Sequence, residues 1–161
     1  MEQSPTLQEL IEMVKRERAA WNALIEQINL EQMTNPGVAG LWSLKDIIAH
    51  ITWHEREMVG LVRAHALVGS ELWNIPTDER NAAIYEEVRQ QPLEQVLEES
   101  TQVYQQLIIV LPSLTDQDLT NPESFPGMPP DWQPWLIIAQ NTYEHYQDHI
   151  SDIERWISKR D

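Results

Sequence analysis

Residues 42–55 read WSLKDIIAHITWHE, and this stretch decides how the rest of the chain is interpreted. Ser43 is typical of a helix N-cap, and Asp46 three residues later completes an N-terminal capping pattern. Apolar residues then recur at steps of three and four, which is the period of an amphipathic helix. We therefore expect a long helix over residues 43–68, with Gly69 marking its C-terminal end.

Three further long segments carry the same helical period, and no useful length of the chain alternates with the period of two that strands require. The long segments are residues 6–28, 92–111 and 131–159, and a shorter helix is expected over residues 77–90. Four long amphipathic helices with a crossover helix between the second and the third predict an all-α four-helix bundle. We expect residues 1–161 to form a single domain of this kind.

The composition narrows the function classes. The 161 residues include 11 Lys plus Arg against 26 Asp plus Glu, so the net charge is -15. Such a charge repels phosphate groups, and on this ground we expect no nucleic-acid partner and no binding to a membrane surface. Cysteine is absent, which excludes disulfides, thiolate nucleophiles and cysteine-ligated metals. Neither a secretory signal nor an apolar run of membrane-spanning length is present, so we expect a cytoplasmic protein.

Four of the five histidines form two pairs. His50 and His54 are four residues apart in the second helix, and His145 and His149 are four apart in the fourth. Residues at positions i and i+4 share a helix face, so each pair can offer two imidazoles to one divalent cation. A third imidazole from the facing helix would leave a coordination position open for water or substrate. Imidazole ligands suit zinc and nickel.

A structural role for these histidines is the competing interpretation. A single histidine pair on an apolar face is more often a satisfied part of the core than a metal site. Two pairs on separate apolar faces favour a metal site, because several buried imidazoles that converge need ligands for their nitrogens. His65 has no such partner and is expected near the surface at the end of its helix.

The motifs resemble those of a known family. Residues 42–55 resemble the second-helix motif of the DinB-like superfamily, and residues 141–149, NTYEHYQDH, resemble its fourth-helix motif. The crossover, with Trp73 and Asn74, is more similar to the ClbS/DfsB branch. The resemblance spans nearly the whole chain. It implies an up-down-down-up bundle, often dimeric, and we accordingly expect a homodimer.

The resemblance also implies a set of site residues. It maps three metal ligands onto His50, His145 and His149. Because a catalytic metal needs an open coordination position, we keep His54 out of this set and expect it to act as an acid-base or orienting residue. Further polar side chains are expected at the pocket, where they would contact substrate; these are Asn81, Tyr85 and Asn141. Glu55 and Glu57 are expected on the exposed side of the second helix.

Three functions follow as alternatives. The first is a metal-dependent enzyme that acts on a small molecule, either by hydrolysing a reactive metabolite or by thiol transfer. Since the chain has no cysteine, thiol transfer would need a low-molecular-weight thiol as cofactor. The second is a bundle that binds and sequesters a small molecule without turnover, in the manner of a resistance protein. The third is a structural bundle whose histidine cluster is vestigial.

Overall fold

The structure is a computed structural model that describes residues 3–159, and this part of the chain contains helices and loops but no β-strand. The long helices are α1 (Leu7–Glu26), α2 (Leu44–Ala64), α4 (Leu93–Val110) and a last helix in two pieces, α5 (Pro134–Gln140) and α6 (Tyr143–Ser158). The crossover carries α3 (Thr77–Val88). Short 3-10 turns lie at Leu30–Gln32, Glu71–Asn74, Leu111–Ser113 and Pro122–Ser124.

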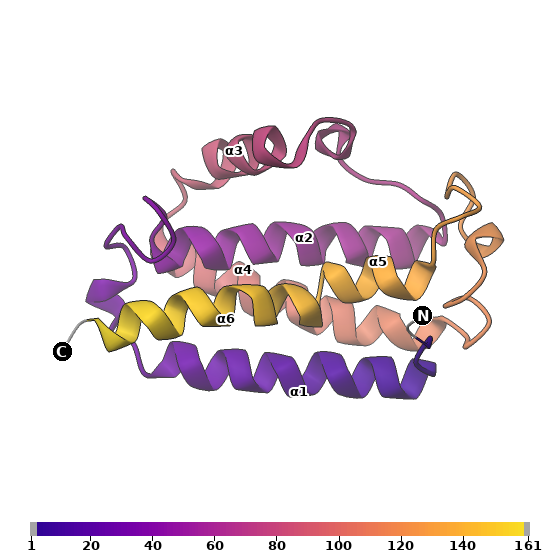
Figure 1. Ribbon diagram of the computed structural model, residues 1–161, viewed down its shortest axis with the longest axis horizontal. Coiled ribbons are helices and arrows are strands. Elements are labelled where there is room, and N and C mark those ends of the chain that lie inside the picture. The colour runs from indigo at the N-terminus through magenta and orange to yellow at the C-terminus, as the bar shows by residue number, and fades with distance from the viewer. Residues whose placement is uncertain (1–2, 160–161) are drawn as a thin grey trace.

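The helix directions define the topology. In Figure 1, α1 and the α5–α6 pair run one way along the bundle, while α2 and α4 run the other way. This is the up-down-down-up order, and it requires a long connection between α2 and α4, because two parallel helices cannot be joined by a tight turn. The connection returns over the outer side of α2 and contains α3 (Figure 1). The predicted all-α bundle with a crossover helix is confirmed.

Helix α2 lies at the centre of the molecule. Fifteen of its 21 residues are buried, because α4 and α6 pack against its inner sides and α3 covers its outer side. Its start is the predicted one: Ser43 Oγ accepts a hydrogen bond from the Asp46 amide, and the Asp46 carboxylate accepts one from the Ser43 amide. The cap satisfies donors that would otherwise be unpaired inside the protein.

The C-terminal end of α2 differs from the prediction. The helix ends at Ala64, and His65 takes the left-handed conformation with φ 49°, so residues 66–68 lie outside the helix. The His65 ring stacks on Phe125, with centroids 5.5 Å apart, and this packing stabilises an early stop. Gly69 does not end the helix but allows a close approach of the chain to Glu57. A Cβ at this position would lie 2.8 Å from a carboxylate oxygen of Glu57, which is too close.

The last long helix is interrupted, where the sequence predicted a continuous helix over residues 131–159. Its N-cap is Gln133, two residues after the expected Asp131. Thr142 leaves the helical region with ψ −102°, and its hydroxyl donates to the Ile138 carbonyl at 2.7 Å. The Asn141 amide group donates to the Ile137 carbonyl in the same way, at 2.8 Å. These side chains bind carbonyls that the helical ladder would otherwise use, and the axis breaks between α5 and α6.

No helix among residues 3–159 combines the length and the apolar character that crossing a bilayer requires.

Candidate functional site: a histidine cluster beside a cavity

The two predicted histidine pairs meet between α2 and α6. Nitrogen atoms of His50, His145 and His149 all lie within 4.8 Å of one another. The Nε2 atoms of His145 and His149 are 3.2 Å apart. The ring of His54 completes the group, with its centroid 4.7 Å from that of His50 and 4.5 Å from that of His145. We call these four residues the histidine cluster.

The cluster is buried, and its polar atoms are not satisfied by the protein. The exposed fraction is 4% for His50, 7% for His54 and 9% for His145, and His149 is half-buried. Each ring has one buried nitrogen without a hydrogen-bond partner among the described residues: Nδ1 of His50, Nε2 of His54, and Nδ1 of His145 and His149. Buried polar atoms are normally paired, so four such nitrogens in one place indicate a site built for something other than packing.

Burial also sets the protonation state. The pKa of His50 falls to about 2, mainly because the ring is buried and in part because of His54 and His149. Burial also lowers the pKa of His54, to about 4, against the hydrogen bond with Asn141, which raises it. The pKa of His145 is well below its ordinary value for the same reason, and the pKa of His149 is lowered by burial as well. All four rings are therefore neutral at pH 7, which is the form that binds a metal ion.

The three facing imidazoles fit a divalent cation. A tetrahedral zinc site with Zn–N distances of about 2.0–2.1 Å separates its ligand nitrogens by roughly 3.3 Å. The 3.2 Å between Nε2 of His145 and Nε2 of His149 matches this value, and His50 faces the pair from α2. Within residues 3–159, no carboxylate or carbonyl orients these rings through Nδ1, so the helices and packing such as that of Trp42 on His50 hold them in place.

His54 has a defined tautomer. Its Nδ1 lies 2.8 Å from Oδ1 of Asn141, and the Asn141 amide nitrogen donates to the Ile137 carbonyl. This second bond fixes Oδ1 as the group that faces His54, so His54 Nδ1 carries the proton and donates it. Nε2 is then left with a free lone pair, and it has no partner. His54 is the imidazole of the cluster that is set up to accept a proton.

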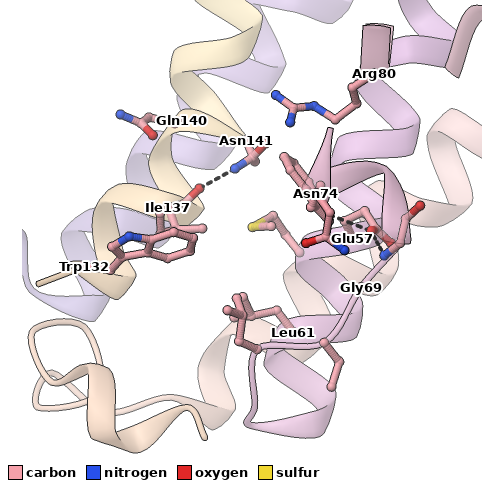
Figure 2. A pocket seen from close by; sticks show the side chains of 14 residues that line it. Glu57, Leu61, Gly69, Asn74, Arg80, Trp132, Ile137, Gln140 and Asn141 are labelled. Atoms are coloured by element: carbon pink, nitrogen blue, oxygen red, sulfur yellow. Dashed lines mark hydrogen bonds between the residues drawn. The ribbon is translucent and has the colours of Figure 1, made fainter. Parts of the chain in front are cut away.

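A cavity of about 490 Å³ lies beside Asn141 (Figure 2), and it reaches the cluster through its wall, because none of the four histidines lines it. It lies between α2, the turn at Glu71–Asn74, the start of α3, and α5. Asn141 both lines the cavity and holds His54, and Trp73, another lining residue, packs its ring 5.5 Å from that of His54. The remaining walls combine apolar side chains, among them Met58, Leu61 and Ile137, with a few polar ones. Such a cavity has the size and lining of a small-molecule site.

Two of the predicted substrate contacts lie elsewhere on α3. Neither Asn81 nor Tyr85 is among the residues that line the cavity, and Tyr85 stacks instead on Trp42 with ring centroids 5.7 Å apart. The α3 side of the cavity is supplied by Arg80, whose guanidinium lies 4.8 Å from the Trp73 ring. Sequence reasoning missed Arg80, because a cation in an acidic amphipathic helix is ordinarily on the solvent side. The substrate-contacting roles of Asn81, Tyr85 and Asn141 stay predictions.

The expectation that Glu55 and Glu57 are exposed is wrong for Glu55 and incomplete for Glu57. Glu55 is completely buried and forms a salt bridge with Arg18, at 3.0 Å. Glu57 is half-buried and accepts hydrogen bonds from the indole of Trp73 at 2.7 Å and from the Ser70 amide at 2.5 Å. The two differences have different causes: Glu55 faces Arg18 and Tyr146 in the interior of the bundle, whereas Glu57 lies beneath the crossover.

Glu55 belongs to a second polar group in the interior, which we call the core ion-pair cluster. Its members are Arg18, Glu55, Ser100 and Tyr146. Arg18 donates to both Glu55 oxygens and to the hydroxyl and carbonyl of Ser100, and the Tyr146 hydroxyl donates to Glu55. Arg18 falls on the apolar stripe of α1, four residues after Val14 and three before Trp21. This position was the available signal of a buried charge.

The helix order defines the class: the protein is an up-down-down-up four-helix bundle with a histidine cluster between two of its helices. A model of the DinB superfamily matches residues 13–153, and the chain belongs to the DinB superfamily.

Solved structures show the same fold at low sequence identity. DfsB, described as a sibling lethal factor precursor, superposes with a TM-score of 0.81 at 16% identity, over 98% of each chain. An uncharacterised protein from Escherichia coli UTI89 gives 0.76 at 15% identity, over 98% of this chain and 96% of that one. The colibactin self-resistance protein ClbS gives 0.73 at 14% identity, over 93% and 94%. Comparison with curated protein sequences gives no match.

One of these structures corrects a prediction. ClbS was solved in complex with double-stranded DNA. The prediction of no nucleic-acid partner rested on the net charge of -15, and it is therefore wrong. Net charge describes the whole surface, whereas a nucleic acid is contacted by one part of it, so overall acidity does not exclude such a partner for this fold.

Proposed function

We propose that the protein is a metal-dependent enzyme that acts on a small molecule bound in the cavity beside the histidine cluster. The observation that carries the proposal is the set of four neutral, buried imidazoles, each with an unpartnered nitrogen, next to a cavity of about 490 Å³. His50, His145 and His149 would hold the cation, and His54 would accept or return a proton at Nε2. Zinc and nickel fit this donor set.

The chemistry divides between the cation and the chain. A divalent cation supplies Lewis acidity, which polarises a substrate and lowers the pKa of a water or a thiol. The chain supplies the position of the substrate and a base: Asn141 keeps the His54 proton on Nδ1 and the lone pair on Nε2. Burial lowers the pKa of His54 to about 4, so the ring is neutral at pH 7 and has a free lone pair, but it is a weaker base than an exposed imidazole. Hydrolysis of a reactive metabolite and transfer of a low-molecular-weight thiol both use these parts.

Metal binding is the first test. We expect the untagged, metal-free protein to bind one zinc or nickel ion per chain in a calorimetric titration at pH 7.5. Because the three Nδ1 atoms lack orienting partners, we expect an affinity roughly 10–100-fold below that of a site that has them. Affinity should fall as the pH drops, because protons compete for the ligands. Wild-type protein that binds neither ion more tightly than millimolar would contradict the proposal.

The ligand assignment is tested by single variants. Replacing His50, His145 or His149 with Ala should remove most of the affinity. His54→Ala should keep the ion, because its Nε2 is outside the group of three. His65→Ala is the matched control, since His65 lies at the end of α2 beside Asp118, away from the cluster. Loss of the ion in His54→Ala with retention in His50→Ala would show that the assignment is wrong.

A second candidate is sequestration without turnover, which the name of ClbS as a self-resistance protein favours for this fold. The two functions differ in the fate of the ligand. An enzyme releases a chemically changed product, and its His54→Ala variant binds the ligand but converts it at least a hundredfold more slowly. A sequestering bundle returns the ligand unchanged, and His54→Ala has no effect on this outcome. Mass spectrometry of ligands recovered from the protein separates the two cases.

We also propose that the chain works as one domain in the cytoplasm, as the sequence itself led us to expect, and as a homodimer, as the family resemblance implied. The match of the family model to residues 13–153 supports one domain. Sedimentation that gives a particle near 18.8 kDa at micromolar concentration would contradict the dimer.

A further inference from the structure

An arginine side chain gives the cavity beside the histidine cluster a positive charge that no carboxylate among the described residues pairs with. Arg80 lines the cavity, and among the described residues it forms no ion pair with a carboxylate. Its terminal nitrogens make two long contacts, 3.2 Å to the Thr77 hydroxyl and 3.5 Å to the Ile75 carbonyl. Its Nε is buried without a partner. In a chain with 26 acidic residues against 11 basic ones, an unpaired arginine facing a cavity is unexpected.

The guanidinium is held in place rather than free. It packs over the ring of Trp73, whose indole nitrogen is in turn fixed by Glu57 at 2.7 Å. Figure 2 shows the Arg80 head on the side of the cavity that faces Asn141, which holds His54. A group bound by Arg80 would therefore lie next to the cluster.

The other walls define the rest of the ligand. Apolar surface on the other walls comes from Leu61, Leu67, Val68, Ile137 and Trp132. Figure 2 shows Leu61 and Trp132 on the side of the cavity away from Arg80. Glu57 is the one carboxylate in the lining, so the described lining carries one positive and one negative charge. Glu57 repels any anion, but it repels a dianionic phosphate more strongly than a carboxylate, which carries one charge and matches the fork of one guanidinium.

We propose that the cavity selects organic carboxylates with an apolar or aromatic body, and that Arg80 is the residue that determines this specificity. The carboxylate binds the Arg80 guanidinium at the end of the cavity near Asn141, and the apolar body lies between α5 and the loop that follows α2. The inference rests on the proposed function only in placing the reacting part of the ligand near the histidine cluster. The preference for carboxylates is a property of the cavity and does not require the metal.

The test uses a pair of probes that differ in charge and share their shape. These are 2-naphthylacetate and 2-naphthylacetamide, titrated against the full chain by ligand-observed nuclear magnetic resonance. We expect the carboxylate to bind roughly tenfold more tightly than the amide, the difference that a charge-assisted hydrogen bond provides. In Arg80→Gln the preference should disappear while the affinity for the amide stays the same. In Arg80→Lys part of the preference should remain.

Arg89→Gln is the matched control. Arg89 directly follows α3, is exposed and pairs with Glu86 at 3.2 Å, so this variant removes the same charge without touching the cavity. We expect it to retain the full preference. Equal binding of acid and amide by wild type, or equal loss of preference in both variants, would overturn the proposal. Tighter and Arg80-dependent binding of 2-naphthyl phosphate, or displacement of the carboxylate by a short DNA duplex, would also overturn it, since Arg80 would then serve phosphate.

Repeating the titration with and without zinc separates this inference from the proposed function. An Arg80-dependent preference in protein that binds no metal supports the inference and contradicts the metal-dependent enzyme. Tight zinc binding without any carboxylate preference supports the metal-dependent enzyme and contradicts the inference. A preference that appears only with zinc and persists in Arg80→Gln shows that the ion, not Arg80, recognises the acid, and it overturns the inference alone.

Discussion

The core ion-pair cluster and the histidine cluster contain adjacent residues of α2, Glu55 and His54. Both of these side chains are buried. In the first, every charged or hydroxyl group has a partner: Arg18 contacts Glu55, Ser100 and Tyr146. In the second, each ring has a nitrogen with no partner among the described residues. Burial alone therefore does not distinguish a structural polar group from a functional one. The two kinds of group are distinguished by whether the protein itself supplies their hydrogen-bond partners.

The comparison has an energetic side. A satisfied buried ion pair contributes little net stability, but it penalises the loss of either partner. Buried imidazole nitrogens without partners cost free energy in the folded protein. An ion held at Nε2 of His145 and His149 leaves their Nδ1 atoms unpartnered, but it stabilises the protein because it binds the folded chain and not the unfolded one. The first cluster should therefore respond most to mutation and the second most to pH and ligand.

Breaking the core ion-pair cluster should give the largest effect. Glu55→Gln leaves the Arg18 charge buried without a counter-ion, and we expect a loss of about 3–5 kcal/mol in the free energy of unfolding, measured by urea denaturation. The double variant Arg18→Met/Glu55→Leu should recover most of it. The control is Glu99→Gln, which breaks the half-exposed pair with Arg56 and should cost less than about 1 kcal/mol. A similar loss in both single variants would refute the distinction.

Acid should act on the histidine cluster next. The pKa of His50 is about 2 in the folded protein against 6.5 in the unfolded chain, so below pH 6.5 the unfolded chain binds more protons. The free energy of unfolding then falls with falling pH, by roughly 1–2 kcal/mol per imidazole between pH 7 and pH 5 in metal-free protein.

The test of this pH dependence is a comparison of urea denaturation at the two pH values. His50→Leu should lose about that much of the dependence. A slope in His50→Leu equal to that of wild type would contradict a neutral, buried His50.

A smaller effect is expected where the protein does satisfy one member of the histidine cluster. Asn141→Ala removes the acceptor of the His54 proton, and we expect a loss of about 1 kcal/mol in stability. Nitrogen-15 resonance of the imidazoles should show that His54 no longer keeps its proton on Nδ1. Gln140→Ala, at the exposed neighbour that lines the same cavity, is the control and should leave the tautomer unchanged.

The smallest effect should come from the histidine outside both clusters. His65→Asn keeps a residue that tolerates the left-handed conformation, and it removes a 3.3 Å contact with Asp118 and the stacking on Phe125, at a side chain that is 40% exposed. We expect a change below about 1 kcal/mol in thermal denaturation and an unchanged metal stoichiometry. A loss of metal in this variant would mean that the end of α2 shapes the cluster.

The sequence predicted the elements whose signals are local. The capping boxes at Thr6 and Ser43 and the helical periods place α1 and α2 nearly to the residue at their starts. The i and i+4 spacing predicted that each histidine pair shares a face, and the family motif indicated that the two faces meet. In these cases the physical cause lies within one or two turns of helix.

The features that the sequence missed depend on distant contacts. The burial of Glu55 requires Arg18 and Tyr146 from two other helices, and the break at Thr142 requires a choice between side-chain and backbone hydrogen bonds. Arg80 reaches the cavity because the crossover returns over α2, which no pattern within α3 reveals. The helical period of α3 could be predicted from the sequence, but the surface that α3 covers could not.

The crossover also gives the molecule two levels of cooperativity. Helix α3 buries only Ile84 and Val88, whereas α2 beneath it is buried on nearly every side. Amide protons in α3 should therefore exchange with solvent through local openings, while those in α2 exchange only when the bundle unfolds. The covering of the histidine cluster can thus fluctuate without disturbing the core, and a ligand that bridges Arg80 and the bundle would slow exchange in α3 alone.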